Sequence, residues 1–168
     1  MKNFVKIAVV TLFMVIAYAN TSKAQDVNLG AGLIYGSEIE NVGLQARADI
    51  GLSESWRLAP SLNFFFPKDV GGVDLKWFAI NLDANYIIPI ESDVVGLYGI
   101  GGLNIAFLSV DFNDDFFEDN TETEIGLNLG IGAEFNIESS VTPFFELKYV
   151  IGDADQAVIA AGVKFPLN

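Results

Sequence analysis

The stretch from Thr123 to Val150 limits the possible folds more than any other part of the chain. Apolar residues occupy every second position of its first half: Ile125, Leu127, Leu129, Ile131, Ala133, Phe135 and Ile137. This period of two predicts a β-strand with two unlike faces. After the turn residues 138–140, a second alternating run begins at Val141, so we expect an antiparallel hairpin. Either a second sheet or lipid has to cover so long an apolar face.

Six further segments alternate in the same way, over 26–36, 42–52, 56–66, 76–88, 94–110 and 156–165. Helical periodicity is absent after residue 24. The connections alternate between tight turns (53–55, 89–93 and 138–140) and generally longer loops (37–41, 67–75, 111–122 and 153–155). Spans near 9–11 residues with this alternation are typical of outer-membrane barrels. The prediction is an all-β fold, an eight-stranded antiparallel up-and-down transmembrane β-barrel.

The first 24 residues have the pattern of a cleaved signal peptide. Lys2 and Lys6 precede an uncharged apolar run over residues 7–19, and the small residues Ser22 and Ala24 suit cleavage after position 24. The apolar run is shorter than the roughly 20 residues that a membrane-anchoring helix needs. We therefore expect export, with residues 1–24 as the signal peptide and 25–168 as one β-barrel domain.

The charge of the chain narrows the choice of partners. Cleavage would remove three of the nine basic residues, leaving six against 22 acidic residues and a formal net charge of −16. Such a surface repels nucleic-acid phosphates, so we expect no nucleic-acid binding. The chain has no cysteine, and without disulfides a closed barrel, in which every strand is paired, would supply the stability that an exported domain needs.

The composition of the non-apolar face favours a membrane barrel over a soluble one. A lipocalin-like barrel has an apolar interior, but eight strands could not enclose all the Phe, Leu and Ile side chains of this chain. With the apolar face outward, polar residues and glycines fill the lumen. Aromatic residues near strand ends would then form the interfacial belts: Tyr35, Trp56, Phe66, Tyr86, Phe107, Phe135, Tyr149 and Phe165.

Four features carry a likeness to a known family: the signal peptide, the eight strands, residues 144–149 (FFELKY) and the apolar last strand that ends near Phe165. With these features the chain resembles the small outer-membrane β-barrels of the outer membrane protein A and X type. That family includes the outer membrane protein beta-barrel domain. The likeness covers the whole mature chain and rests on repetition rather than on one motif. Family chains often end on the aromatic residue, whereas here three residues follow Phe165. The resemblance implies residence in the outer membrane, contact with its lipid and lipopolysaccharide, and insertion by the outer-membrane assembly machinery.

Candidate site residues on the polar face form an expected network of ion pairs in the lumen: Arg47, Asp49, Arg57, Asp83, Glu134, Glu146, Lys148 and Lys164. Buried charges must be paired, so we interpret the carboxylates as partners of these cations rather than as catalytic groups. An eight-stranded barrel is just wide enough for its side chains to fill, which predicts a plugged lumen.

Enzymatic activity is not expected. The enzyme classes known on small outer-membrane barrels, which are lipid A modifying enzymes and omptin-like proteases, would need a histidine base. This chain contains no histidine, so its serines lack their usual activator. No cofactor is expected either.

The loop over residues 111–122 is the one compositional outlier. Six of its twelve residues are acidic: Asp111, Asp114, Asp115, Glu118, Asp119 and Glu122. Clustered oxygens suit Ca²⁺ or Mg²⁺, but the spacing is not that of an EF-hand, so the choice lies between a solvated acidic loop and a weak divalent site. The three phenylalanines of the loop, Phe112, Phe116 and Phe117, could anchor it on the barrel rim, in lipid or on a surface partner.

The sequence thus predicts a small, monomeric, non-enzymatic protein of the outer membrane with a structural or surface-interaction role. The alternative is a secreted soluble lipocalin-like barrel that binds a small apolar ligand. A third interpretation is a narrow porin.

Overall fold

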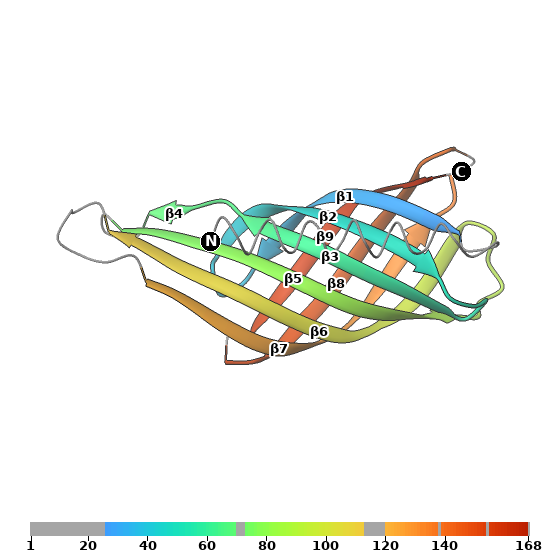
Figure 1. Cartoon of the computed structure of the whole chain (residues 1–168). Helices are drawn as coiled ribbons and strands as arrows, with labels where there is room; N and C mark the ends of the chain where they lie inside the picture. The colour runs from blue at the N-terminus through green and yellow to red at the C-terminus, as the bar shows by residue number, and fades with distance from the viewer. Residues whose placement is uncertain (1–25, 70–72, 113–119, 138, 154, 168) are drawn as a thin grey trace.

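The chain forms a closed antiparallel barrel (Figure 1). The computed structural model describes residues 26–69, 73–112, 120–137, 139–153 and 155–167. The predicted signal peptide, residues 1–24, lies outside these ranges. Within them, no helix has the length and apolarity to cross a membrane.

Eight long strands build the wall, and they are β1 (Val27–Gly36), β2 (Asn41–Gly51), β3 (Trp56–Phe65), β5 (Val73–Ile88), β6 (Val95–Phe112), β7 (Asn120–Phe135), β8 (Thr142–Gly152) and β9 (Gln156–Pro166). A two-residue strand, β4 (Lys68–Asp69), pairs only with β5, next to the wall strand β3. Each wall strand pairs with the next wall strand along the chain, so that β3 pairs with β5, and β1 pairs with β9 to close the barrel. The predicted eight-stranded up-and-down topology is therefore confirmed.

The pairing register fixes how far the strands are staggered. We start at Trp56 of β3 and step each time to the directly paired residue of the neighbouring strand, which leads round the barrel to Val42 of β2. The circuit closes on β3 at Phe66, whose backbone N–H donates to the carbonyl of Val42 at 2.9 Å. The return point lies ten residues farther along the chain. A stagger of this size goes with strands tilted by about 40° from the barrel axis.

The two ends of the barrel differ. At the turn end lie the connections 52–55, 89–94 and 136–141, together with the first residue of β1 and the last of β9. At the loop end lie the strand ends that the other four connections join. There β5, β6 and β7 reach beyond the remaining strands (Figure 1), because their ladder continues to the pairs Val73↔Phe112 and Val110↔Asn120. The sequence placed the starts of β5 and β7 three residues later, at residues 76 and 123.

The two prolines that interrupt the alternating pattern have different effects. Pro60 lies within β3, and the β2–β3 ladder has no residue pairs between Arg47↔Ser61 and Ile50↔Leu58, which is the part opposite this proline. Proline has no N–H to donate there. Pro143 is the second residue of β8, where strands tolerate proline.

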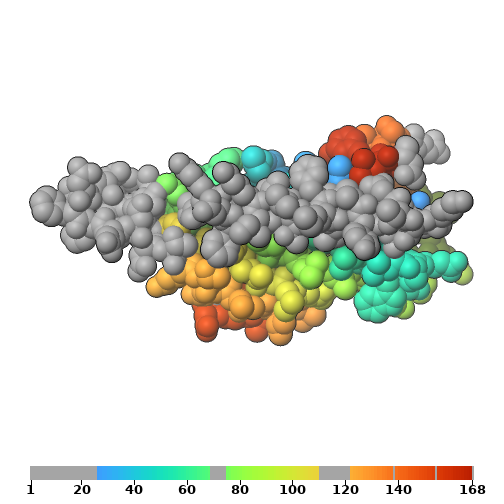
Figure 2. Space-filling view, viewed as in Figure 1, coloured from blue at the N-terminus to red at the C-terminus, as the bar shows by residue number. Residues whose placement is uncertain are grey.

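The apolar face points outward, as predicted. Ile125, Leu129 and Ile131 are 69%, 63% and 63% exposed. In Figure 2 the atoms of β5, β6 and β7, coloured green, yellow and orange, adjoin one another on the outer surface of the barrel. Seven of the eight aromatic residues expected near strand ends are exposed, and Phe107 is half-buried with its ring 6.0 Å from that of Phe78. A surface this apolar suits lipid and not water.

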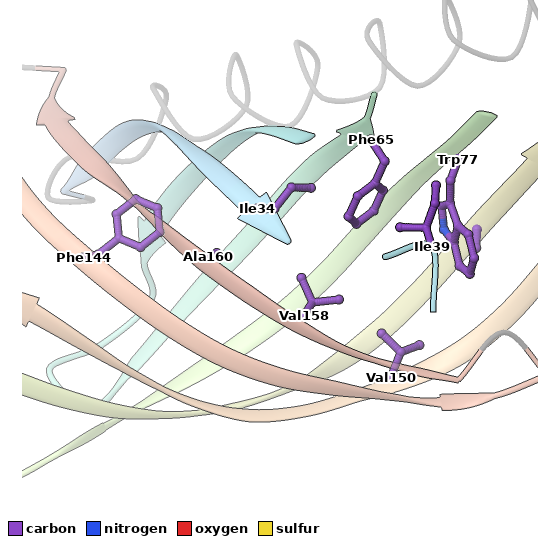
Figure 3. Close-up of a cluster of buried hydrophobic side chains, with 9 residues drawn as sticks. Ile34, Ile39, Phe65, Trp77, Phe144, Val150, Val158 and Ala160 are labelled. Carbon is purple, nitrogen blue, oxygen red and sulfur yellow. The ribbon is translucent and has the colours of Figure 1, made fainter. Parts of the chain in front are cut away.

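The interior is polar at the turn end and in the middle but apolar toward the loop end. There Ile34, Phe65, Trp77, Val150 and Val158 point inward and pack together (Figure 3). The prediction that polar residues fill the lumen is therefore wrong for this end. The sequence could have predicted this apolar end, because these apolar residues occupy the same alternate positions as the polar residues of their strands. Asn136, a polar residue at an alternate position just beyond the end of β7, lies exposed and donates to the carbonyl of Asp93.

Candidate functional site

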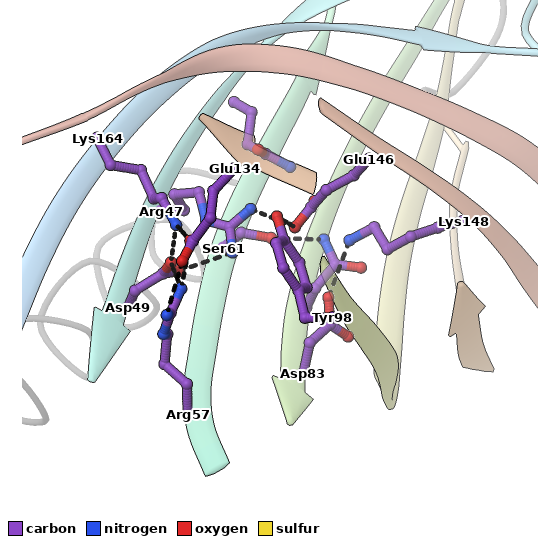
Figure 4. A network of polar contacts seen from close by, with 12 residues as sticks. Arg47, Asp49, Arg57, Ser61, Asp83, Tyr98, Glu134, Glu146, Lys148 and Lys164 are labelled. Atoms are coloured by element: carbon purple, nitrogen blue, oxygen red, sulfur yellow. Dashed lines mark hydrogen bonds and ion pairs between the residues drawn. The ribbon is translucent and has the colours of Figure 1, made fainter. Parts of the chain in front are cut away.

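The eight predicted ionic residues lie inside the barrel, on inward positions of six strands (Figure 4). Six of them are buried, while the side chains of Arg57 and Glu134 remain 18% and 19% exposed toward the turn end. Strand alternation places each side chain on the inner face, and barrel closure brings the strands together. The residues come from β2, β3, β5, β7, β8 and β9, so no local segment could form this cluster alone.

Asp49 of β2 binds three cations. Its Oδ1 accepts from Nη2 and Nε of Arg47 at 2.7 and 2.9 Å, and its Oδ2 accepts from Lys164 at 3.0 Å and Arg57 at 3.3 Å. Arg47 is only two residues away on the same face, whereas Lys164 is reached across the barrel seam. A fully buried carboxylate is thus surrounded by N–H donors.

Two glutamates share the same cations. Glu134 accepts two hydrogen bonds from Arg57, at 2.8 and 3.2 Å, and is also paired with Lys164. Glu146 accepts from Nη1 of Arg47 at 2.5 Å. The cluster is therefore continuous from β3 to β8.

A second group of polar residues continues the network toward the middle of the barrel. Lys148 pairs with Oδ2 of Asp83 at 2.9 Å, and Asn128 donates to Oδ1 of the same carboxylate at 2.7 Å. The Asn128 and Asn104 amides also donate to Oδ1 of Asn81, at 2.9 and 2.7 Å. Each of these side chains is almost completely buried.

The charges of this cluster cancel. Two arginines and two lysines face four carboxylates in this cluster. Buried ions are tolerated when they are paired and hydrogen-bonded, and removing one partner leaves a costly unpaired charge. The arrangement is that of mutually neutralising ions, without a histidine, since the chain has none.

Tyr98 belongs to this network, although the sequence did not single it out. Its hydroxyl donates to Oε1 of Glu146 at 3.0 Å, and its ring is 1% exposed. The ring lies over Gly132 of β7, where a Cβ would stand 2.3 Å from ring carbons. The alternation of the sequence already places Tyr98 of β6 and Glu146 of β8 on the inner face. Their contact, however, depends on the stagger of the strands.

The possible weak divalent site of loop 111–122 falls largely outside the described residues. Asp114, Asp115, Glu118 and Asp119 lie outside the described ranges, as does the side chain of Asp111, and Glu122 is exposed. Across the part of the chain that the structure describes, no three acidic side chains are arranged to hold a metal ion.

The outward apolar face, the closed antiparallel wall and the ionic interior define a class, the small integral β-barrels of outer membranes. Residues 6–165 match the family described as outer membrane protein beta-barrel domain, and the chain belongs to this family. It is therefore a small, non-enzymatic protein of the outer membrane. The soluble lipocalin-like alternative is overturned by this membership and by the outward apolar face.

Solved structures confirm the fold at low sequence identity. Ail of Yersinia pestis, crystallised with the heparin analogue sucrose octasulfate, has a TM-score of 0.63 at 14% identity, covering 85% of this chain and 97% of its own. The N-terminal barrel of Pseudomonas aeruginosa OprF has a TM-score of 0.64 at 19% identity, with coverages of 84% and 97%. Neisserial surface protein A has a TM-score of 0.63 at 21% identity, with coverages of 84% and 96%. No curated protein matches this chain.

Proposed function

We propose that this barrel is a rigid, plugged scaffold that presents an acidic surface at its loop end, with a structural or surface-interaction role. In this proposal the loop end faces away from the cell and the turn end faces the periplasm, as in barrels with short periplasmic turns and longer extracellular loops. The protein acts as a monomer in contact with outer-membrane lipid and lipopolysaccharide, inserted by the assembly machinery.

The observation that carries the proposal is the separation of charges. Four of the six basic residues after position 24 are neutralised inside the barrel. Thirteen carboxylates occur in the loop-end connections and the strand residues beside them, over 37–40, 66–76, 111–124 and 153–155. Only Lys68 and Lys76 accompany them there. A surface with this excess of negative charge attracts cations or a basic partner.

The loop 111–122 contributes six of these thirteen carboxylates, the largest share of any connection. Asp114 and Asp115 are adjacent in the sequence, as are Glu118 and Asp119, and consecutive Cα atoms are about 3.8 Å apart. That spacing is shorter than the roughly 8 Å over which physiological salt screens charges. Divalent cations shared with lipopolysaccharide phosphates or with a partner would neutralise them, and the loop's phenylalanines would add apolar anchors. The heparin analogue in the Ail structure is an anion, which the strongly acidic loop end of this chain would repel.

The test replaces Asp114, Asp115, Glu118 and Asp119 with Asn or Gln and measures Ca²⁺ binding to the purified barrel and adhesion of expressing cells. Both should fall. A matched control replaces Glu54, Glu91 and Asp93 at the turn end, and neither quantity should change. Unaltered Ca²⁺ binding and adhesion in the loop variant, with the barrel folded, would refute the proposed role of the loop.

The plugged interior predicts no diffusion pathway, in contrast to the narrow-porin alternative. Planar-bilayer recordings of the purified barrel should show no stable open channel. A steady ohmic conductance, lost in an Arg47→Met variant that still folds, would favour the porin instead.

A further inference from the structure

A cavity of about 270 Å³ opens at the loop end, next to the apolar cluster of the interior. Its wall is drawn from the β1–β2 connection, from β5, β6 and β7, and from Asp153 after β8. All of its lining residues belong to the described chain. The volume suits a small molecule of little more than ten non-hydrogen atoms, near the lower limit of usual ligand pockets.

The floor of the cavity is apolar and firmly packed. Ile39 and Trp77 are 5% and 6% exposed, and Leu108 packs against the same cluster. The indole ring of Trp77 meets the ring of Phe65 edge-on, with centroids 6.2 Å apart (Figure 3). An apolar floor of this kind favours an organic ligand over a hydrated ion.

The rim carries three carboxylates, those of Glu38, Glu124 and Asp153, and one cation, Lys76. The formal charge of the lining is therefore negative. Oε2 of Glu124 is buried without a hydrogen-bond partner, and so is Nε1 of Trp77. A buried acceptor on a carboxylate is left unsatisfied until a donor reaches it, and a positively charged N–H group is the strongest such donor.

The rim is held in place by the β1–β2 connection. The backbone N–H of Ser37 donates to the carbonyl of Ala157, and the N–H of Ala157 donates back to Oγ of Ser37, both at 2.9 Å. At the other end of the turn Lys68 pairs with Glu40 at 2.8 Å. Glu40 itself has a φ of 50°, in the left-handed region that tight turns use. Glu38 and Ile39 are thus placed before any ligand arrives, which reduces the entropy lost on binding.

From these observations we infer that the cavity binds a small organic cation, an amine or guanidinium joined to an aliphatic or aromatic body. The apolar body lies on the floor beside Trp77 and Leu108, and the cationic head pairs with Glu124 and Asp153. None of the residues that line this cavity belongs to the acidic loop 111–122. The inference goes beyond the proposed function, and it holds or fails independently of that loop.

The experiment uses the purified, folded barrel in a zwitterionic detergent at physiological salt. Trp56→Phe leaves Trp77 as the sole tryptophan and hence as the reporter, since the chain has two. Phenethylammonium should produce a saturable change in its fluorescence. Phenylpropionate, an anion of similar shape, and neutral phenylethanol should bind at least fivefold more weakly. Equal binding of either analogue would overturn the inference, as would the absence of a saturable response to phenethylammonium.

A matched pair of variants localises the charge effect. Glu124→Gln with Asp153→Asn should weaken phenethylammonium binding at least fivefold, whereas Glu91→Gln with Asp93→Asn at the turn end should leave it unchanged. Equal weakening by both pairs would show only general attraction to an acidic protein and would refute the site. Heat-modifiable gel mobility confirms folding, and Glu38→Gln in the exposed connection replaces the first pair if that pair fails to fold.

Discussion

The ring of Tyr98 on β6 fills the space that Gly132 leaves on β7, with a position for Cβ only 2.3 Å from the ring. The same ring places its hydroxyl on Glu146 of β8 at 3.0 Å. An inward glycine thus lets a tyrosine lie flat across its neighbouring strand and reach a carboxylate beyond it. Such covering of a strand glycine by an aromatic ring is a known way of fixing strand register.

Gly132→Ala should destabilise the barrel by about 1–3 kcal/mol, because the added methyl group overpacks a closely filled interior. Gly101→Ala is the matched control: nothing lies within 4 Å of its added Cβ, and its effect should stay within about 0.5 kcal/mol. Urea-dependent unfolding in lipid vesicles measures both. In the Tyr98→Leu background the cost of Gly132→Ala should shrink, and an undiminished cost would show that the tyrosine ring is not its cause.

Lys148→Met should cost on the order of 3–5 kcal/mol, since it leaves the buried carboxylate of Asp83 without its cation. Adding Asp83→Asn removes the stranded charge, so the double variant should recover much of the loss. Unfolding free energies of the two single variants and the double variant form the test cycle. Strict additivity would contradict a direct interaction between these two residues.

Leu129→Arg should destabilise the folded barrel by about 2–4 kcal/mol, because Leu129 projects from the middle of β7 toward lipid. Ile137→Arg lies beyond the end of the same strand and should cost about 0–1 kcal/mol. Unfolding in vesicles of one lipid composition provides the comparison. Similar costs at the two positions would be inconsistent with a membrane placed around the middle of the barrel.

The ion pair between Glu40 and Lys68 should be visible in a pH titration. The hydrogen bond from Lys68, with its positive charge, lowers the pKa of the Glu40 carboxyl below its ordinary value of 4.5. A lowered folded-state pKa means that the contribution of this pair is fully present above the unfolded-state pKa and is lost as the pH falls through the folded one. Carboxyl NMR shifts should show Glu40 titrating below 4.5, and Lys68→Gln should return its midpoint to the ordinary value. An unshifted midpoint in the unaltered protein would contradict the pair.

Much of the fold follows from the sequence because side-chain direction in a strand is a local property. The alternation at Leu127, Asn128 and Leu129 predicts which side chains face lipid and which face the interior. The same pattern makes this prediction in every strand. The excess of apolar side chains on one face then requires lipid outside. The neutral set of four cations and four carboxylates was also visible, because all eight residues lie on the polar face.

The partners within the interior were decided only by the tertiary structure. Arg47 could be expected to meet Asp49, which is two residues away. Its contact with Glu146, 99 residues away, exists because the stagger of the strands brings Arg47 of β2 and Glu146 of β8 to the same height in the barrel. The apolar loop end arises in the same way, since Ile34, Trp77 and Val158 meet only after closure. Alternation determines the face on which a side chain lies, whereas barrel closure and stagger determine which side chains from distant strands share one level of the lumen.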